Sequence, residues 1–262
     1  MSLVEALTLA AAAGAAGVVN AVAGGGTMIT FPSLLFFGTP GIVANATSTL
    51  ALVIGTSSSI YAFRKQLAAV KPWLKRFVPI SLLGGLVGSI LLTHTQEKVF
   101  AKLVPFLLLF ATILFLLQGF FRKLSQPKDP AEEQILHGPA LAGAIVFQFF
   151  VSVYGGYFGA GIGILMLASF GILGLRDIHE MNAIKNLVGS LINQVAAIYF
   201  IFAGLIDWPK AGVMTLGALI GYFLGAHYSQ RISQKRVRQI ITAVGFTISA
   251  VLFYQQFARK IF

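Results

Sequence analysis

Long runs without a charged residue constrain this chain more than any other feature. No Asp, Glu, Lys or Arg occurs from Ala6 to Phe63, from Leu103 to Phe121 or from Ile135 to Leu175. About 20 apolar residues in a helix cross the hydrocarbon layer of a bilayer. Backbone polar groups must be paired with one another inside lipid, so such runs are expected to be helical. The sequence predicts an all-α, polytopic integral membrane protein with about eight to ten membrane segments, some of them broken or re-entrant.

The few charges of the chain are placed as in a membrane protein. Charged residues make up 10% of the sequence, whereas soluble domains carry about 25%. The net charge is +11, and the basic residues lie between the apolar runs. This placement is typical of cytoplasmic loops and does not favour binding to nucleic acid. The chain has no cysteine, and its four histidines have no ligand spacing. We therefore expect the lipid bilayer as a partner, and neither a metal nor a cofactor.

The chain contains an internal repeat. A shift of 137 residues places Asn45 on Asn182 and Gly84 on Gly221, and the register holds over about 60 residues. We expect a first repeat at 1–125, a polar cytoplasmic linker at 126–134 and a second repeat at 135–262. Each repeat is expected to contain an apolar helix, a glycine-rich break, a short apolar segment and three long helices. The expected segments are 3–22, 28–37, 42–63, 73–93 and 99–121, then 139–157, 162–173, 181–205, 210–230 and 236–257.

The basic loops differ between the two repeats. In the first repeat they follow the first long helix, and in the second they follow the second long helix. Short basic loops face the cytoplasm, so the two repeats should cross the membrane in opposite directions. Inverted repeats of this kind are a recurring plan of secondary transporters. Both chain ends would then be external, although Arg259 and Lys260 argue against this for the C-terminus. The basic loop residues are Arg64, Lys65, Lys71, Lys75 and Arg76 in the first repeat, and Arg231, Lys235, Arg236 and Arg238 in the second.

Two glycine-rich breaks interrupt the apolar runs. The first contains Gly24, Gly25, Gly26 and Thr27, and the second contains Gly159 and Gly161 among further glycines. Each glycine costs a helix about 1 kcal/mol relative to alanine. Broken backbone at membrane depth is tolerated where it faces protein or a water-filled cavity. Each break could be a bent span, a re-entrant pair or two crossings, and the glycines could instead serve close helix packing.

The breaks also suggest a binding site. The N-terminus of a helix carries a partial positive charge and exposed N–H groups, which bind anions. In inverted repeats, two such breaks can meet near the midplane and face one site. The breaks therefore predict a shared anion site between the two repeats.

A polar cluster follows each break. Asn45, Ser48 and Thr49 share one helix face, because they are spaced i, i+3 and i+4. The repeat places Asn182, Lys185 and Asn186 on the matching face, which would suit a small oxyanion. An ionisable group in the membrane, such as Lys185, usually marks a functional path. The alternatives are that Lys185 extends to the cytoplasmic interface and that the other polar groups form interhelical hydrogen bonds. Weaker candidates are Asn20, Asn193 and Gln194.

The residues around the breaks resemble those of the TauE/SafE family, also called sulfite exporters or the toluene-sulfonate uptake permease family. The resemblance rests on the Gly24–Gly26 break with Pro32 after it, on the segment Ala44–Thr49, and on their degenerate second copies. It implies transport of sulfite, sulfonates or related sulfur-containing organic anions across the bacterial cytoplasmic (inner) membrane. No site residue is taken from the resemblance.

The expected function is secondary transport of a small anionic solute by alternating access between two inverted repeats. A passive anion channel or a membrane scaffold remains an alternative. An intramembrane enzyme is disfavoured, because the chain shows neither a nucleophile with a base nor a metal cluster. A homo-oligomer is compatible with the sequence. The candidate substrate-binding residues are Gly24, Gly25, Gly26, Thr27, Asn45, Ser48, Thr49, Gly159, Gly161, Asn182, Lys185 and Asn186.

Overall fold

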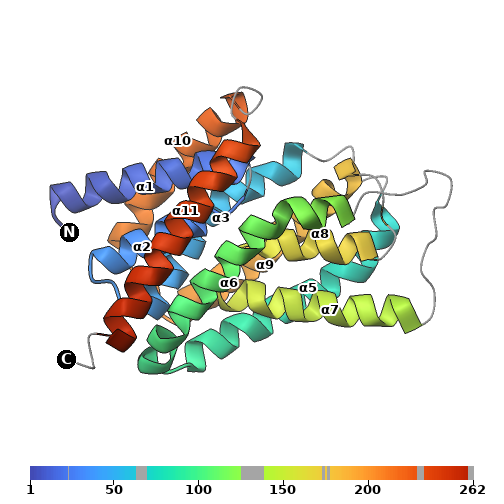
Figure 1. Ribbon diagram of the computed structural model, residues 1–262, viewed down its shortest axis with the longest axis horizontal. Coiled ribbons are helices and arrows are strands. Elements are labelled where there is room, and N and C mark those ends of the chain that lie inside the picture. Colours follow the sequence, from blue (N-terminus) through green and yellow to red (C-terminus); the bar gives the residue numbers. More distant parts are fainter. Residues whose placement is uncertain are drawn as a thin grey trace.

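The computed structural model describes residues 1–22, 24–62, 70–124, 139–172, 175, 178–228 and 233–258. In these residues the chain forms ten α-helices followed by a π-helical turn, and no strand (Figure 1). The predicted all-helical fold is thus confirmed, whereas the predicted linker 126–134 lies outside the described residues. The helices are α1 (Leu3–Val22), α2 (Thr27–Phe36), α3 (Gly41–Ala62), α5 (Lys71–His94), α6 (Glu97–Leu124), α7 (Pro139–Tyr157), α8 (Ile162–Ile172), α9 (Ile178–Phe202), α10 (Trp208–Tyr228) and α11 (Gln234–Phe253), with η1 (Tyr254–Ala258).

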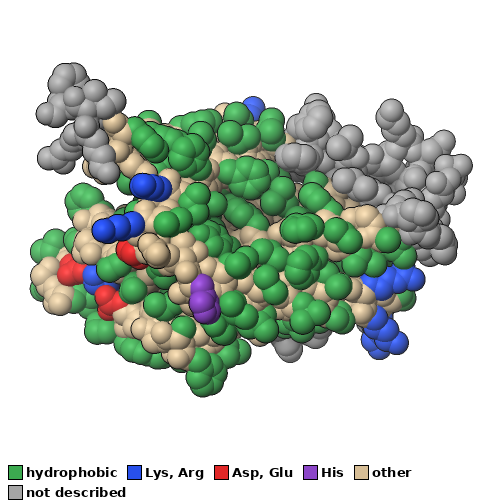
Figure 2. Space-filling model, turned by 90° about the horizontal axis from the view of Figure 1, so that it is seen from below, with side chains coloured by type: hydrophobic (Ala, Val, Ile, Leu, Met, Phe, Trp, Pro, Cys, Tyr) green, Lys and Arg blue, Asp and Glu red, His purple; other side chains and the backbone are tan. Residues whose placement is uncertain are grey.

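Several helices are long and apolar enough to cross a membrane. Among the described residues, five meet that description by length and composition, and they fall within α1, α5, α6, α9 and α11 with η1. Large apolar side chains point outward, among them Leu216, Ile220 and Phe223 on α10. Figure 2 shows a face covered mostly by apolar side chains, with charged side chains gathered toward its two ends. Such a surface would be a liability in water but matches the hydrocarbon of a bilayer. The predicted polytopic membrane protein is therefore confirmed.

Corresponding helices of the two halves run in opposite directions. In Figure 1, α1 starts at the N-terminus and runs away from it, whereas α7 runs back toward that end, and α6 and α11 are opposed in the same way. One end of the molecule, called here the N-terminal end, contains the starts of α1, α3, α6 and α10 and the end of α11. The other end, called here the linker end, contains the ends of α3, α6 and α10 and the starts of α5, α7 and α11. This arrangement favours inverted repeats.

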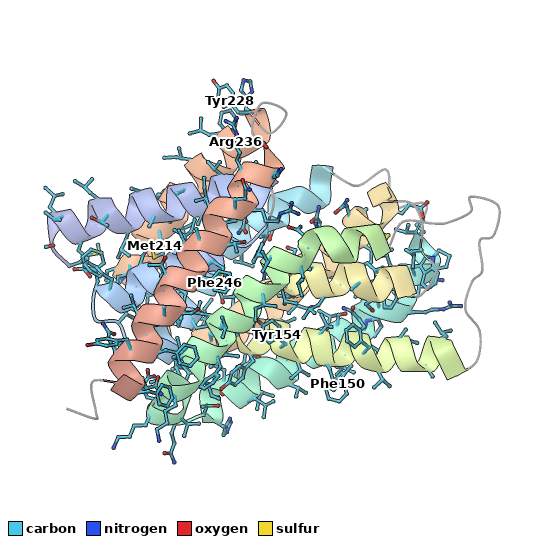
Figure 3. All side chains as sticks on the ribbon, viewed as in Figure 1. Phe150, Tyr154, Met214, Tyr228, Arg236 and Phe246 are labelled. Carbon is cyan, nitrogen blue, oxygen red and sulfur yellow. The ribbon has the colours of Figure 1, made fainter. Side chains whose placement is uncertain are left out.

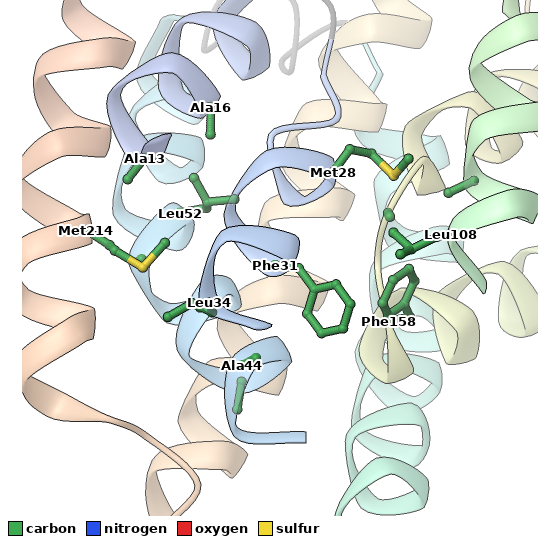
Figure 4. Packing of buried hydrophobic residues seen from close by; sticks show 14 of the residues in the cluster. Ala13, Ala16, Met28, Phe31, Leu34, Ala44, Leu52, Leu108, Phe158 and Met214 are labelled. Atoms are coloured by element: carbon green, nitrogen blue, oxygen red, sulfur yellow. The ribbon is translucent and has the colours of Figure 1, made fainter. Parts of the chain in front are cut away.

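The chain reverses direction at each glycine break. α1 and α2 pack against each other, and Figure 4 shows the chain rising from Ala13 to Ala16 and descending from Met28 to Leu34. α7 and α8 pack against each other in the same manner. Gly24 and Gly25 have φ angles of 78° and 96°, and Gly159 and Gly161 both have 79°. Only glycine adopts such angles at little cost. This reversal excludes one continuous bent span and favours the re-entrant pair among the three predicted geometries.

The two halves are packed together in matching ways. α1 packs most extensively on α10, and α7 packs most extensively on α5, so each first helix crosses to the other half. A Cβ placed on Gly221 would overlap the backbone of Gly14, and one on Gly84 would overlap the backbone of Phe149. The repeat register pairs Gly84 with Gly221, as expected for two related halves. The interpretation of these glycines as close-packing residues is confirmed, and the division into two repeats stays a prediction that this packing favours.

Replacing Gly221 by leucine should destabilise the fold, because the side chain has no space between α1 and α10. Overpacking of this kind costs about 1–3 kcal/mol or more. The apparent melting temperature of the purified protein in detergent measures the effect. Gly212→Leu is the matched control, because Gly212 lies on the same helix with open space at its Cβ position. Equal melting temperatures for the two variants would contradict the close-packing account.

Candidate functional site

A cavity of about 690 Å³ lies between the two glycine breaks. Its wall includes Gly24 and Gly25 from the first break and Gly159 and Gly161 from the second. The wall is completed by residues of α1, α2, α3, α6, α8, α9, α10 and α11. The two breaks, which are more than 130 residues apart in the chain, therefore border one space.

Most of the residues predicted from sequence lie on the wall of this cavity. Nine of the twelve candidates line it, and they come from both halves of the chain. Asn20 and Asn193, the weaker candidates, line it as well. The nine are Gly24, Gly25, Thr27, Thr49, Gly159, Gly161, Asn182, Lys185 and Asn186.

The other three candidates lie outside the cavity wall and are occupied by internal contacts. The N–H of Gly26 donates to Oδ1 of Asn20 at 2.6 Å. Asn45 is buried, and its Nδ2 donates to the carbonyl oxygen of Tyr157 at 3.1 Å. The buried hydroxyl of Ser48 shares a hydrogen bond of 2.6 Å with a threonine of α2. These groups therefore support the fold around the breaks in the conformation that the structure describes.

Asn20 fixes the first break. While its Oδ1 accepts from Gly26, its Nδ2 donates to the hydroxyl of Tyr222 on α10 at 2.8 Å. The ring of Phe115 lies directly against Gly25, where a side chain on that residue would overlap it. One N–H at the start of α2 is thus already paired within the protein. The positive end of α2 is consequently less available to an anion than the sequence alone suggests.

The second break is fixed by Tyr154 of α7. Figure 3 places this residue near the middle of the molecule, and its hydroxyl donates to the carbonyl oxygen of Ala160 at 2.7 Å. The chain then enters α8 through Gly161, and Gly163 also lines the cavity. The start of α8 therefore borders the cavity, and the helix dipole favours negative charge at such an end.

Lys185 lies on the cavity wall, beside the start of α8. Its Nζ donates to Oδ1 of Asn182 at 3.0 Å, and its aliphatic chain lies against Gly163. Asn186, on the same turn of α9, lines the cavity too. The side chain of Lys185 is thus directed to the interior space between the breaks.

The cavity is electropositive. Besides Lys185 it is lined by Lys235 and Arg238 of α11, and none of the described residues that line it is Asp or Glu. In surroundings of low dielectric constant such an excess of positive charge attracts anions strongly. In the described part of the chain, no group of three His, Cys, Asp or Glu side chains is arranged to hold a metal ion. The arrangement is suited to reversible binding of an anion.

Sequence reasoning missed Lys235 and Arg238 as cavity residues. Both were assigned to a basic cytoplasmic loop, yet they stand at the start of α11. Their i, i+3 spacing places them on one helix face, which is the signal that could have identified them. Further polar residues of the wall that were not predicted are Thr56, Gln118, Ser190 and Tyr222.

Known proteins match the chain over almost its full length. The "Probable membrane transporter protein" of Haemophilus influenzae is 29% identical over 92% of this chain and 91% of its own length. The "Probable membrane transporter protein YfcA" of Escherichia coli K12 is 28% identical over 94% of this chain and 88% of its own. YunE of Bacillus subtilis, a protein with the same description, is 24% identical over 92% of this chain and 94% of its own.

No solved structure matches the chain. The family model described as "Sulfite exporter TauE/SafE" matches residues 9–252, in agreement with the resemblance seen at the glycine breaks. The chain accordingly belongs to the TauE/SafE family of membrane transporters.

Proposed function

We propose that this protein is a secondary transporter of a small anion, and that sulfite, an organosulfonate or a related sulfur-containing organic anion is its substrate. The observation that carries the proposal is the cavity between the two breaks, with three cationic side chains and no carboxylate among its described lining residues. The description of the family as sulfite exporters supports the sulfur-containing class of anion. The protein acts in the cytoplasmic membrane, with the basic linker end on the cytoplasmic side.

The anion binds against α9 and the start of α8. The ammonium group of Lys185 forms the central contact, and the amides of Asn182 and Asn186 donate to the remaining oxygens. Charge-assisted hydrogen bonds of this kind are shorter and about twice as strong as neutral ones. Lys235 and Arg238 attract the anion toward the cavity from the linker end.

Transport follows from rearrangement of the two halves around this site. Each half is tied to the other through a close-packed pair, α1 with α10 and α5 with α7, in which glycines bring the backbones into contact. Such pairs move as units, because their close packing leaves little freedom for internal change. Rocking of the two units exposes the site alternately to each end.

Replacing Lys185 by glutamine should weaken anion binding. The change removes the ammonium charge and keeps a side chain of similar length, so about 1.5–3 kcal/mol of charged hydrogen bonding is lost, or roughly 10- to 100-fold in affinity. The half-saturating anion concentration for uptake into proteoliposomes measures the effect. Lys75→Gln removes an equal charge from an exposed lysine outside the cavity and serves as the control. Unchanged affinity in Lys185→Gln would rule out the assigned contact.

Purified protein in proteoliposomes should move sulfite or an organosulfonate with saturation. Carboxylates of similar size should be transported less well, because their planar pair of oxygens offers fewer acceptors than the three oxygens of a sulfonate. Isotope flux across a panel of these anions gives the comparison. Conductance without saturation would identify a channel instead, and absence of flux for the whole panel would contradict transport of this class of anion.

A further inference from the structure

The cavity is open toward the linker end and closed toward the N-terminal end. Lys235 lines the cavity and is also exposed at the start of α11, so the space reaches the surface there. Toward the N-terminal end, the rings of Phe31, Phe100 and Phe158 are buried against one another. The centroid of Phe31 lies 5.3 Å from that of Phe158 and 6.4 Å from that of Phe100, and Figure 4 shows the first pair. We take these buried rings, of which Phe158 also lines the cavity, as the barrier between the site and the N-terminal end.

The open and closed ends differ in one pair of helix contacts. The repeat register matches α3 with α9 and α6 with α11. α3 packs directly on α6, whereas α9 and α11 have no comparable contact among the described residues. The cavity lies in the space between α9, which carries Lys185, and α11, which carries Arg238. The closed end is therefore the one at which α6 stays in contact with α3.

Glu97 makes the polar contact between α6 and α3. One of its carboxylate oxygens accepts a short hydrogen bond from the N–H of Gly41, and the other accepts from the N–H of Ile42 at 3.2 Å. The carboxylate thus pairs two N–H groups at the start of α3, where the helix dipole favours negative charge. The repeat register places the uncharged Gln234 at the matching position of α11. The carboxylate of Glu97 therefore has no counterpart at the matching position of α11.

Ser48 occupies the position on α3 that matches Lys185 on α9. Ser48 is fully buried, whereas Lys185 lines the cavity. If the two halves exchange conformations, α3 separates from α6 and Ser48 becomes accessible from the N-terminal end. The accessibility of position 48 thus reports which end of the protein is open.

We infer that Glu97 is a positioning residue of the transport cycle: by pairing the N-terminus of α3 it holds α6 against α3 and keeps the N-terminal end closed. The inference rests on the proposed alternating access. It assigns no substrate contact to Glu97, which stands at the surface at the start of α6. Its loss is expected to shift the protein toward the state that is open at the N-terminal end.

Thiol labelling tests this assignment, because the chain has no cysteine of its own. Ser48→Cys and Asn182→Cys each place one thiol, and a membrane-impermeant maleimide is applied from one face at a time to oriented vesicles. Adding Glu97→Gln should raise the labelling rate at position 48 from the N-terminal face about tenfold, as expected for the loss of one charge-assisted contact. The labelling rate at position 182 from the linker face should fall at the same time.

The opposite changes at the two positions separate a shift between states from general loosening. Faster labelling at both positions, or no change at either, would overturn the role of Glu97. Lys98→Gln is the matched control, since its exposed side chain has no hydrogen bond among the described residues and should leave both rates unchanged. Intact anion flux with unchanged labelling would refute only the role of Glu97, whereas absence of flux in the wild-type protein would refute the proposed function.

Discussion

Backbone N–H and C=O groups inside a bilayer must find partners, and this requirement governs the structure around both glycine breaks. An unpaired group in hydrocarbon costs about several kcal/mol. Asn20 pairs the N–H of Gly26, and Tyr154 pairs the carbonyl of Ala160. The remaining backbone of the breaks borders a cavity large enough to hold water or an anion. The proposed transport site is thus located where the membrane would otherwise forbid an interrupted helix.

Glycines, which have no side chain, also account for the close packing of the two halves. Glycines bring α1 onto α10 and α5 onto α7 with backbone in contact with backbone. In lipid there is little hydrophobic force between helices, so van der Waals contact at short range holds them together. The re-entrant pairs α1–α2 and α7–α8 are therefore each attached to the opposite half. In the proposed alternating access, a displacement of one half would therefore move the break of the other.

The sequence predicted the helices well, because long apolar runs ended by polar residues leave few alternatives. The expected segment 42–63, for example, is observed as Gly41–Ala62. Ser48 and Asn45 were expected at the site because the repeat matches them with Lys185 and Asn182, but they are buried. Ser48 and Asn45 form hydrogen bonds within the protein instead, whereas Thr49 on the same face of α3 does line the cavity. Lys235 and Arg238 were missed because positive charge at a helix start is usually explained by membrane topology alone.

The central claim is that one anion binds between the two breaks, next to Lys185. A crystal structure of the protein with selenite, a heavier analogue of sulfite, tests it directly through the anomalous signal of selenium. The account predicts a selenium peak in the cavity with an oxygen within about 3 Å of the Lys185 Nζ, the usual distance of such a hydrogen bond. Selenium bound only at the protein surface, with the cavity between the breaks empty of it, would contradict the account.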